Sequence, residues 1–143
     1  MITNMMPTQV TMEKSINIPS KIESINLVEK LVDEISEESA INSEVYGKIL
    51  IATVEAVNNS IVHGNKEDDS KRIDITFKVS EEKVSVFVED EGEGFDFNHV
   101  PDPTKPENIE NIHGRGVYLM QHLADEVEFH GDGNRVELIF NMI

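Results

Sequence analysis

The stretch from Ile49 to Gly64 constrains the fold most, because it is apolar on almost every side when it is drawn as a helix. A helix of this kind is normally buried. Glu55 and Asn59 are four residues apart, so they are neighbours on one face. A carboxylate in such a face is costly unless something pairs with it. The stretch therefore predicts a central helix on which Glu55 either faces a ligand, such as a metal-bound one, or is a core carboxylate satisfied by a backbone group or a Lys.

Five shorter runs alternate between apolar and polar residues, which is the pattern of half-buried β-strands. The runs cover residues 11–18, 73–79, 84–88, 127–129 and 136–140. Ser80–Lys83 predicts a tight turn between the second and third runs, and Gly131–Asn134 predicts one between the last two. Strands joined by tight turns are antiparallel neighbours. The sheet is therefore expected to be mixed but mostly antiparallel.

Three helices are expected beside these strands. The first covers Ser20–Glu37 and begins with a capping-box match, Ser20-x-x-Glu23. The second is the opening stretch, Ser43–His63, with Asn42 or Ser43 as its cap and Gly64 as its end. The third covers Val117–Ala124. The order predicts an α/β (α+β) two-layer sandwich, with a sheet of about five strands and three helices on one face.

Length and composition bound the class of protein. The 143 residues predict a single domain, 1–143, with a flexible N-terminus at 1–9. There is no Cys, and the sequence holds neither a membrane-spanning run nor a signal pattern, so we expect a cytoplasmic protein without membrane contact. A formal net charge of −16 argues against direct nucleic-acid binding. The same charge repels free nucleotide phosphates, so a nucleotide ligand needs a divalent cation.

A second carboxylate in an apolar pattern, after Glu55, lies at the end of the third alternating run. Asp90 has the parity of the apolar residues in that run, so its carboxylate should point inward. Gly92 and Gly94 follow it directly. Residues 95–113 then hold three Pro and little periodicity, which is typical of a lid or binding loop, although a plain surface loop is the alternative. Together these features place a carboxylate, two glycines and a lid next to one another.

The sequence Gly114-Arg115-Gly116 precedes the third helix, and a glycine-led helix start offers backbone N–H groups to an anion. An inward Asp90 can accept a hydrogen bond from an exocyclic amine such as that of adenine. Asn59 offers an amide oxygen suited to Mg²⁺, and Glu55 is placed to accept a proton during phosphoryl transfer. Each motif alone is weak, because Gly-x-Gly is most often only a turn. Their ordered combination is the specific signal.

The combination resembles a known superfamily. Glu55-x-x-x-Asn59, Asp90-x-Gly92-x-Gly94 and Gly114-x-Gly116 are similar to the N, G1 and G2 boxes of the GHKL ATPases. More narrowly, the chain resembles the bacterial anti-sigma-factor serine/threonine protein kinases from about Met12 to Met142. The matching stretches are Glu55–Gly64, Asp90–Gly94, Thr104–Glu107 and Asp125–Val127.

The resemblance implies a Bergerat-type ATP site and a role for each motif residue. Asp90 is expected to bind the adenine amine, Asn59 to hold Mg²⁺, and Glu55 to act as the general base. The residues expected to shape the pocket are Gly92, Gly94, Gly114 and Gly116. Lys105 or Arg115 is expected to reach the phosphates, and Arg115 is the stronger candidate because residues 111–113 hold no Lys or Arg.

The resemblance also implies partners. Family members phosphorylate a Ser or Thr of a small antagonist with a STAS fold, bind a sigma factor alternately with it, and are typically homodimers. Two other interpretations stay open at this point. One is an ATP-gated protein-binding regulator with little or no kinase activity, in which Glu55 is structural. The other is a structural domain without nucleotide, in which all three motifs are coincidental.

Overall fold

The computed structural model describes residues 9–93, 112–131 and 134–142. Five strands in this part of the chain form one sheet in the order β1-β2-β3-β5-β4, and all four pairings are antiparallel. The strands are β1 (Met12–Pro19), β2 (Arg72–Val79), β3 (Lys83–Glu89), β4 (Glu126–His130) and β5 (Arg135–Asn141). The sheet confirms the expected strands to within a few residues at their ends.

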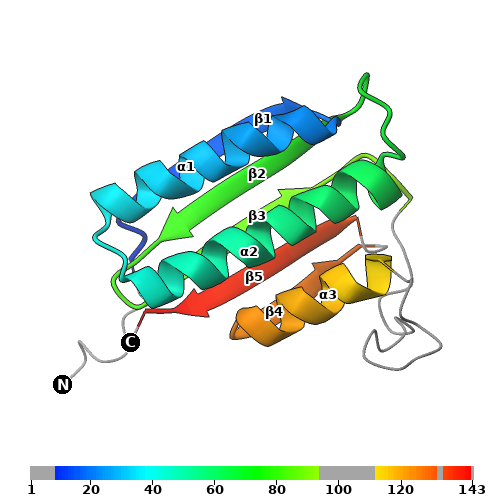
Figure 1. Ribbon diagram of the computed structural model, residues 1–143. Coiled ribbons are helices and arrows are strands. Elements are labelled where there is room, and N and C mark those ends of the chain that lie inside the picture. Colours follow the sequence, from blue (N-terminus) through cyan, green and yellow to red (C-terminus); the bar gives the residue numbers. More distant parts are fainter. Residues whose placement is uncertain (1–8, 94–111, 132–133, 143) are drawn as a thin grey trace.

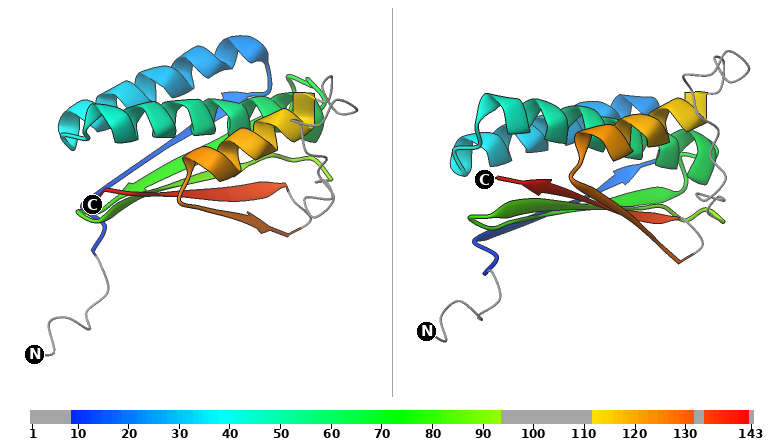
Figure 2. Two further views of the ribbon diagram at one scale, coloured as in Figure 1. Left: turned by 60° about the horizontal axis from the view of Figure 1, so that its bottom comes forward. Right: turned by 90° about the horizontal axis from the view of Figure 1, so that it is seen from below.

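The helices lie on one face of this sheet (Figures 1 and 2). They are α1 (Ile25–Glu38), α2 (Ser43–Asn59) and α3 (Ile112–Leu123), with short turns η2 (Ile22–Ser24) and η3 (Ser60–Gly64). The helix α2 contacts α1 on one side and α3 on the other, and it also lies against β3 and β5. The two-layer α+β sandwich is therefore confirmed, with the opening stretch of the sequence as its central helix.

Alternate residues of the central strands form the core beneath α2. Ile73, Ile75 and Phe77 of β2 are at most 1% exposed. Phe77 pairs across the sheet with Val86 of β3, which is fully buried. Burial of each large apolar side chain stabilises the fold by about 1.5–3 kcal/mol. This core holds β3 and α2 in place relative to each other, which matters because α2 carries Glu55 and Asn59 and Asp90 directly follows β3.

The start of α1 differs from the capping-box prediction. Ser20 is fully buried and its hydroxyl has no hydrogen-bond partner among the described residues. The chain instead forms the 3₁₀ turn η2 before α1 begins at Ile25, and no side chain caps either segment. The capping-box assignment was wrong because Ser20 is drawn inward just after Pro19, the last residue of β1. At the next helix, the Asn42 cap is confirmed: its Oδ1 accepts from the N–H of Val45 at 2.9 Å.

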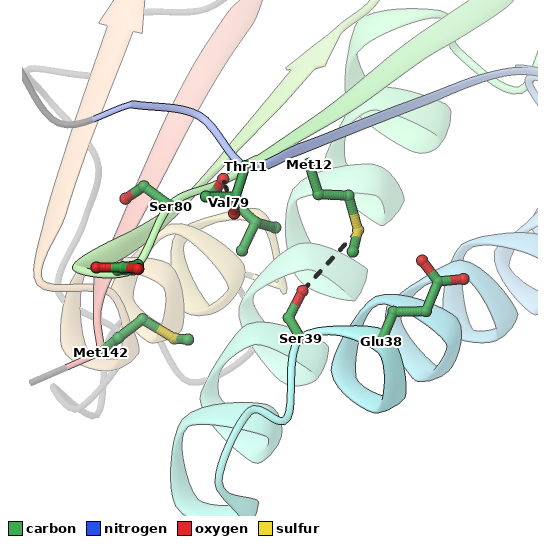
Figure 3. A pocket seen from close by; sticks show the side chains of 8 residues that line it. Thr11, Met12, Glu38, Ser39, Val79, Ser80 and Met142 are labelled. Carbon is green, nitrogen blue, oxygen red and sulfur yellow. Dashed lines mark hydrogen bonds between the residues drawn. The ribbon is translucent and has the colours of Figure 1, made fainter.

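One pocket lies at the end of the sheet where β2 turns into β3 (Figure 3). Its walls include Met12, Val79 and Met142, and the hydroxyl of Ser39 lies 3.9 Å from the sulfur of Met12. Asp90 follows the opposite end of β3. This pocket is therefore separate from the residues that the sequence assigns to a site. Among the described helices, none is both long and apolar enough to cross a membrane.

Candidate functional site

Glu55 and Asn59 lie on the side of α2 that faces α3. A methyl group built on Gly116 of α3 would stand 3.1 Å from both the Oδ1 of Asn59 and the Oε2 of Glu55. Both polar oxygens thus approach the backbone of α3 at one point, and a side chain at position 116 would force them to move. The structure brings together three of the predicted site residues: Glu55, Asn59 and Gly116.

The side chain of Asn59 is almost buried yet incompletely satisfied. Asn59 is 8% exposed, and its Nδ2 has no hydrogen-bond partner among the described residues. A buried N–H group left without a partner costs about 1–3 kcal/mol, and this donor is suited to an acceptor such as a water or a phosphate oxygen, while the Oδ1 of Asn59 stays available to a cation. Beside it, Glu55 supplies a carboxylate oxygen. Amide and carboxylate oxygens are the ligand types that Mg²⁺ prefers, so the donor set fits this ion.

Asp90 forms a second polar group just beyond the C-terminal end of α2, where it bonds to Ser60. It follows β3, and its side chain is only 8% exposed, which confirms the inward orientation predicted from parity. Burial raises the pKa of Asp90 above its usual 3.8. The backbone N–H of Gly92, which donates to Oδ1 at 2.8 Å, and the hydroxyl of Ser60 partly oppose that increase in the pKa. A carboxylate has about four acceptor sites, so Asp90 can accept from a further hydrogen-bond donor besides these two.

The end of α2 is shaped to admit this carboxylate. The segment η3 is a π-helical turn, in which the N–H of Asn65 donates to the carbonyl of Ser60 at 2.8 Å. Wide turns of this kind are frequent at functional sites. A methyl group on Gly64 would collide with the carboxylate of Asp90, and one on Gly92 would collide with the carbonyl of Gly64. The helical segment ends at Gly64 as predicted, but the residue is needed for close approach and does not have a positive φ.

This close approach gives a testable expectation for Gly64→Ala. The added methyl must displace the Asp90 carboxylate, so we expect a loss of about 1–3 kcal/mol of stability together with weaker ligand binding. Gly47→Ala is the matched control, because nothing lies within 4 Å of the position of its new methyl group and Ala is the better helix former. Urea unfolding of both variants measures the difference. Equal stabilities of the two variants would contradict the packing described here.

Three residues of this site were missed by sequence analysis: Ser60, Gly64 and Asn134. The carbonyl of Asn134 accepts from the N–H of Asp90 at 2.9 Å, and its Nδ2 donates back to the carbonyl of Asp90 at 3.4 Å. The sequence assigned Asn134 only to a hairpin turn and Gly64 only to a helix end. The inward parity of Asp90 was the available signal, because a buried carboxylate requires donors and space around it.

The remaining predicted residues fall into two groups. Gly94, Lys105 and nearly all of the predicted lid at 95–113 lie outside the described residues, as does the predicted flexible N-terminus apart from residue 9. Gly114 and Arg115 lie within α3, which begins at Ile112. The expectation that both glycines precede the helix was therefore wrong, since the backbone is already helical there and Gly116 serves close packing on α2.

Comparison with known families matches this architecture. Residues 18–140 match the histidine kinase-like ATPase domain. The serine-protein kinase RsbW of Bacillus subtilis is 30% identical over 118 residues, which are 77% of this chain and 72% of that protein. The protein of the same name from Listeria monocytogenes is 27% identical over 124 residues, which are 82% of this chain and 79% of the relative.

A solved structure gives the same fold. The crystal structure of the RsbU and RsbW domains of Rv1364c from Mycobacterium tuberculosis superposes with a TM-score of 0.64 at 16% identity. The match covers 92% of this chain and 32% of that longer chain. On the family match and the 30% identity together, the chain belongs to the histidine-kinase-like (GHKL) ATPase family, in its branch of anti-sigma-factor serine/threonine-protein kinases.

Proposed function

We propose that this kinase uses ATP and Mg²⁺ to phosphorylate a Ser or Thr of a STAS-domain antagonist, and that it alternately binds a sigma factor in a partner-switching circuit. The observation that carries the proposal is the pair of polar groups on one helix. Glu55 and the unsatisfied Asn59 face Gly116, and Asp90 is buried against the end of the same helix. The proposed nucleotide lies at the C-terminal end of α2, with its base at Asp90 and its phosphates at Asn59.

Each predicted site residue has a role in this proposal. Asp90 accepts a hydrogen bond from the exocyclic amine of adenine, and its burial favours that contact over one with water. Asn59 is the protein ligand of Mg²⁺, and Lys105 or Arg115 neutralises the phosphates. The residues that shape the pocket are Gly92, Gly94, Gly114 and Gly116. The proposal includes one domain over 1–143 and an ATP lid at about 95–113.

Glu55 is the proposed catalytic residue. Its carboxylate accepts the proton of the partner's Ser or Thr hydroxyl while the hydroxyl oxygen bonds to the γ-phosphorus. The bond from that phosphorus to the β,γ-bridging oxygen breaks at the same time, and the electron pair leaves with ADP. Bound Mg²⁺ supplies charge neutralisation at the phosphate oxygens. Because Glu55 is half-buried on a packed helix, its carboxylate is held in place before the partner arrives.

The alternative is an ATP-gated binding regulator of the same fold with little or no kinase activity. In that case ATP changes affinity for a protein partner and Glu55 is structural. A pull-down of the STAS partner by wild type and Glu55→Gln, with and without ATP, separates the two functions. The regulator is favoured if both proteins capture the partner equally, if capture depends on ATP, and if the partner is not phosphorylated.

Nucleotide binding is tested by thermal unfolding. We expect Mg²⁺ with ATP or ADP to raise the Tm, since a ligand that binds only the folded state stabilises it by about 2.7 kcal/mol at a hundred times its Kd. EDTA should remove most of the increase in Tm, because the chain is strongly acidic and phosphates need the cation. If neither nucleotide changes the Tm with Mg²⁺ present, the proposed nucleotide site is wrong.

The proposal includes a homodimer formed through β1 and α1. The strand β1 is an edge of the sheet, and the exposed Leu27 lies beside a hollow lined by Ile16 and Leu31. Lys30 and Glu34 also line this hollow, so a two-fold axis can place each beside the opposite charge of the second copy. We expect Leu27→Glu to yield monomers by light scattering. Ile51→Glu, at another exposed apolar residue, is the control that should stay dimeric.

A further inference from the structure

Asn65 is a buried polar residue for which the proposed chemistry has no use. It is 1% exposed and follows the last residue of η3. Its Oδ1 accepts from the backbone N–H of Glu91 at 2.9 Å, and its Nδ2 donates to the carbonyl of Arg72 at 3.1 Å. One side chain thus connects the end of the central helix, the first residue of β2 and the segment just after β3.

These bonds restrain the chain on the C-terminal side of Asp90. Glu91 is the next residue, so a bond to its N–H fixes the peptide unit that joins it to Asp90. On the other side, the N–H of Asp90 is held by the carbonyl of Asn134. The chain around Asp90 is therefore anchored by the β4–β5 turn and by the end of the central helix, and the carboxylate of Glu91 adds a bond to β2 by accepting from the N–H of Arg72. Among the described residues, Asn65 provides the side chain that bonds to the backbone of Glu91.

We infer that Asn65 is a positioning residue for base recognition: it holds the carboxylate of Asp90 over the end of the central helix at the distance that the adenine amine requires. This inference rests on the proposed nucleotide site. Asn65 itself does not touch the nucleotide. It acts through Asp90, whose carboxylate occupies the space left by Gly64, one residue before Asn65. A small displacement of a hydrogen-bonding group is enough to lose selectivity for the ligand.

The physical consequence is specific to the base. Loss of the Asn65 amide leaves the N–H of Glu91 and the carbonyl of Arg72 without these partners at a partly buried place, and the segment shifts to satisfy them. Asp90 shifts with it, and the contact to the exocyclic amine is weakened. Contacts to the sugar and the phosphates are made by other residues, so they are unaffected. Inosine triphosphate has a carbonyl in place of that amine, and it therefore reports the remaining contacts.

The test compares the Kd of ATP and of inosine triphosphate, with Mg²⁺, by competition for a fluorescent nucleotide. We expect Asn65→Leu to weaken the binding of ATP about tenfold and that of inosine triphosphate little. The ratio of the Kd of inosine triphosphate to the Kd of ATP, which measures the preference for ATP, should therefore fall by about that factor. Asn65→Asp keeps an oxygen for the N–H of Glu91. Its added charge acts on both triphosphates alike, so it should retain most of the ratio.

Asn42→Leu is the matched control, because it removes an Asn side-chain bond at the other end of the same helix. It should lower stability and leave the ratio unchanged. If wild type prefers ATP and Asn65→Leu keeps the same ratio, Asn65 is only structural and the inference fails. If wild type binds neither nucleotide, the proposed function fails first. If Asn65→Leu does not fold, Asn65→Asp decides the test. Loss of the preference for ATP in that variant also overturns the inference.

Discussion

Glu55→Gln is expected to keep ATP binding and to lower phosphate transfer to the partner by about 10²–10⁴-fold. Gln has the same shape and still fills the space opposite Gly116, where a carboxylate oxygen of Glu55 stands 3.1 Å from the position of a built methyl group. It has no oxygen basic enough to take the proton of the attacking hydroxyl. The substitution therefore separates the chemistry from binding, measured as single-turnover transfer and nucleotide Kd on the same protein.

Glu44→Gln is the control for this experiment. Glu44 lies in the first turn of α2, its side chain is 82% exposed, and it forms an ion pair with Lys48 at 3.7 Å. Its substitution changes the net charge by the same amount without touching the site. Transfer by Glu55→Gln at the wild-type rate would show that Glu55 is not the base. Parallel loss of ATP binding would instead place Glu55 among the groups that hold the metal.

Asp90→Asn is expected to weaken ATP binding by about 10–100-fold without lowering stability. The amide keeps an oxygen for the N–H of Gly92 but turns a donor toward the adenine amine. Stability is retained because burial raises the pKa of Asp90, which means that the folded state carries the charge at a cost. The variant has no such charge, so it is expected to unfold at the same or a higher temperature than wild type.

The same pKa change fixes the pH dependence. The raised pKa of Asp90 favours the folded wild type below 3.8, and this contribution is lost as the pH rises through the folded-state pKa. Relative to wild type, the free energy of unfolding of Asp90→Asn should increase over that pH range and stay constant above it. Urea unfolding at several pH values measures this difference. A variant that loses stability relative to wild type as the pH rises would contradict the buried-charge account.

Patterns with a strict period predicted most of the fold. The alternation in β2 and β3 fixed which side chains face the helices, and the inward position of Asp90 followed from the same parity. The mixed apolar and polar character of the central helix placed Glu55 and Asn59 on one side. These predictions succeeded because burial of alternate residues is decided by many side chains together, so single exceptions do not change the outcome.

Features that depend on tertiary contacts were not predictable in this way. The hydroxyl of Ser20 faces the interior, where a local capping rule expects it to bond to a helix start. The π turn at Ser60–Gly64 packs against the carboxylate of Asp90, which follows a strand that is distant in the sequence. Gly116 likewise packs on side chains of another helix. Each of these positions is decided by a residue that is far away in sequence.

The most direct test of the proposed kinase is label transfer from [γ-³²P]ATP to a STAS-domain protein encoded near this one. The kinase, Mg²⁺ and the partner are incubated together, and the labelled residue of the partner is identified by mass spectrometry. The account predicts one labelled Ser or Thr, with transfer lost on addition of EDTA and in Glu55→Gln. A partner that stays unlabelled although the kinase binds both it and Mg²⁺-ATP would contradict the account and favour the ATP-gated regulator.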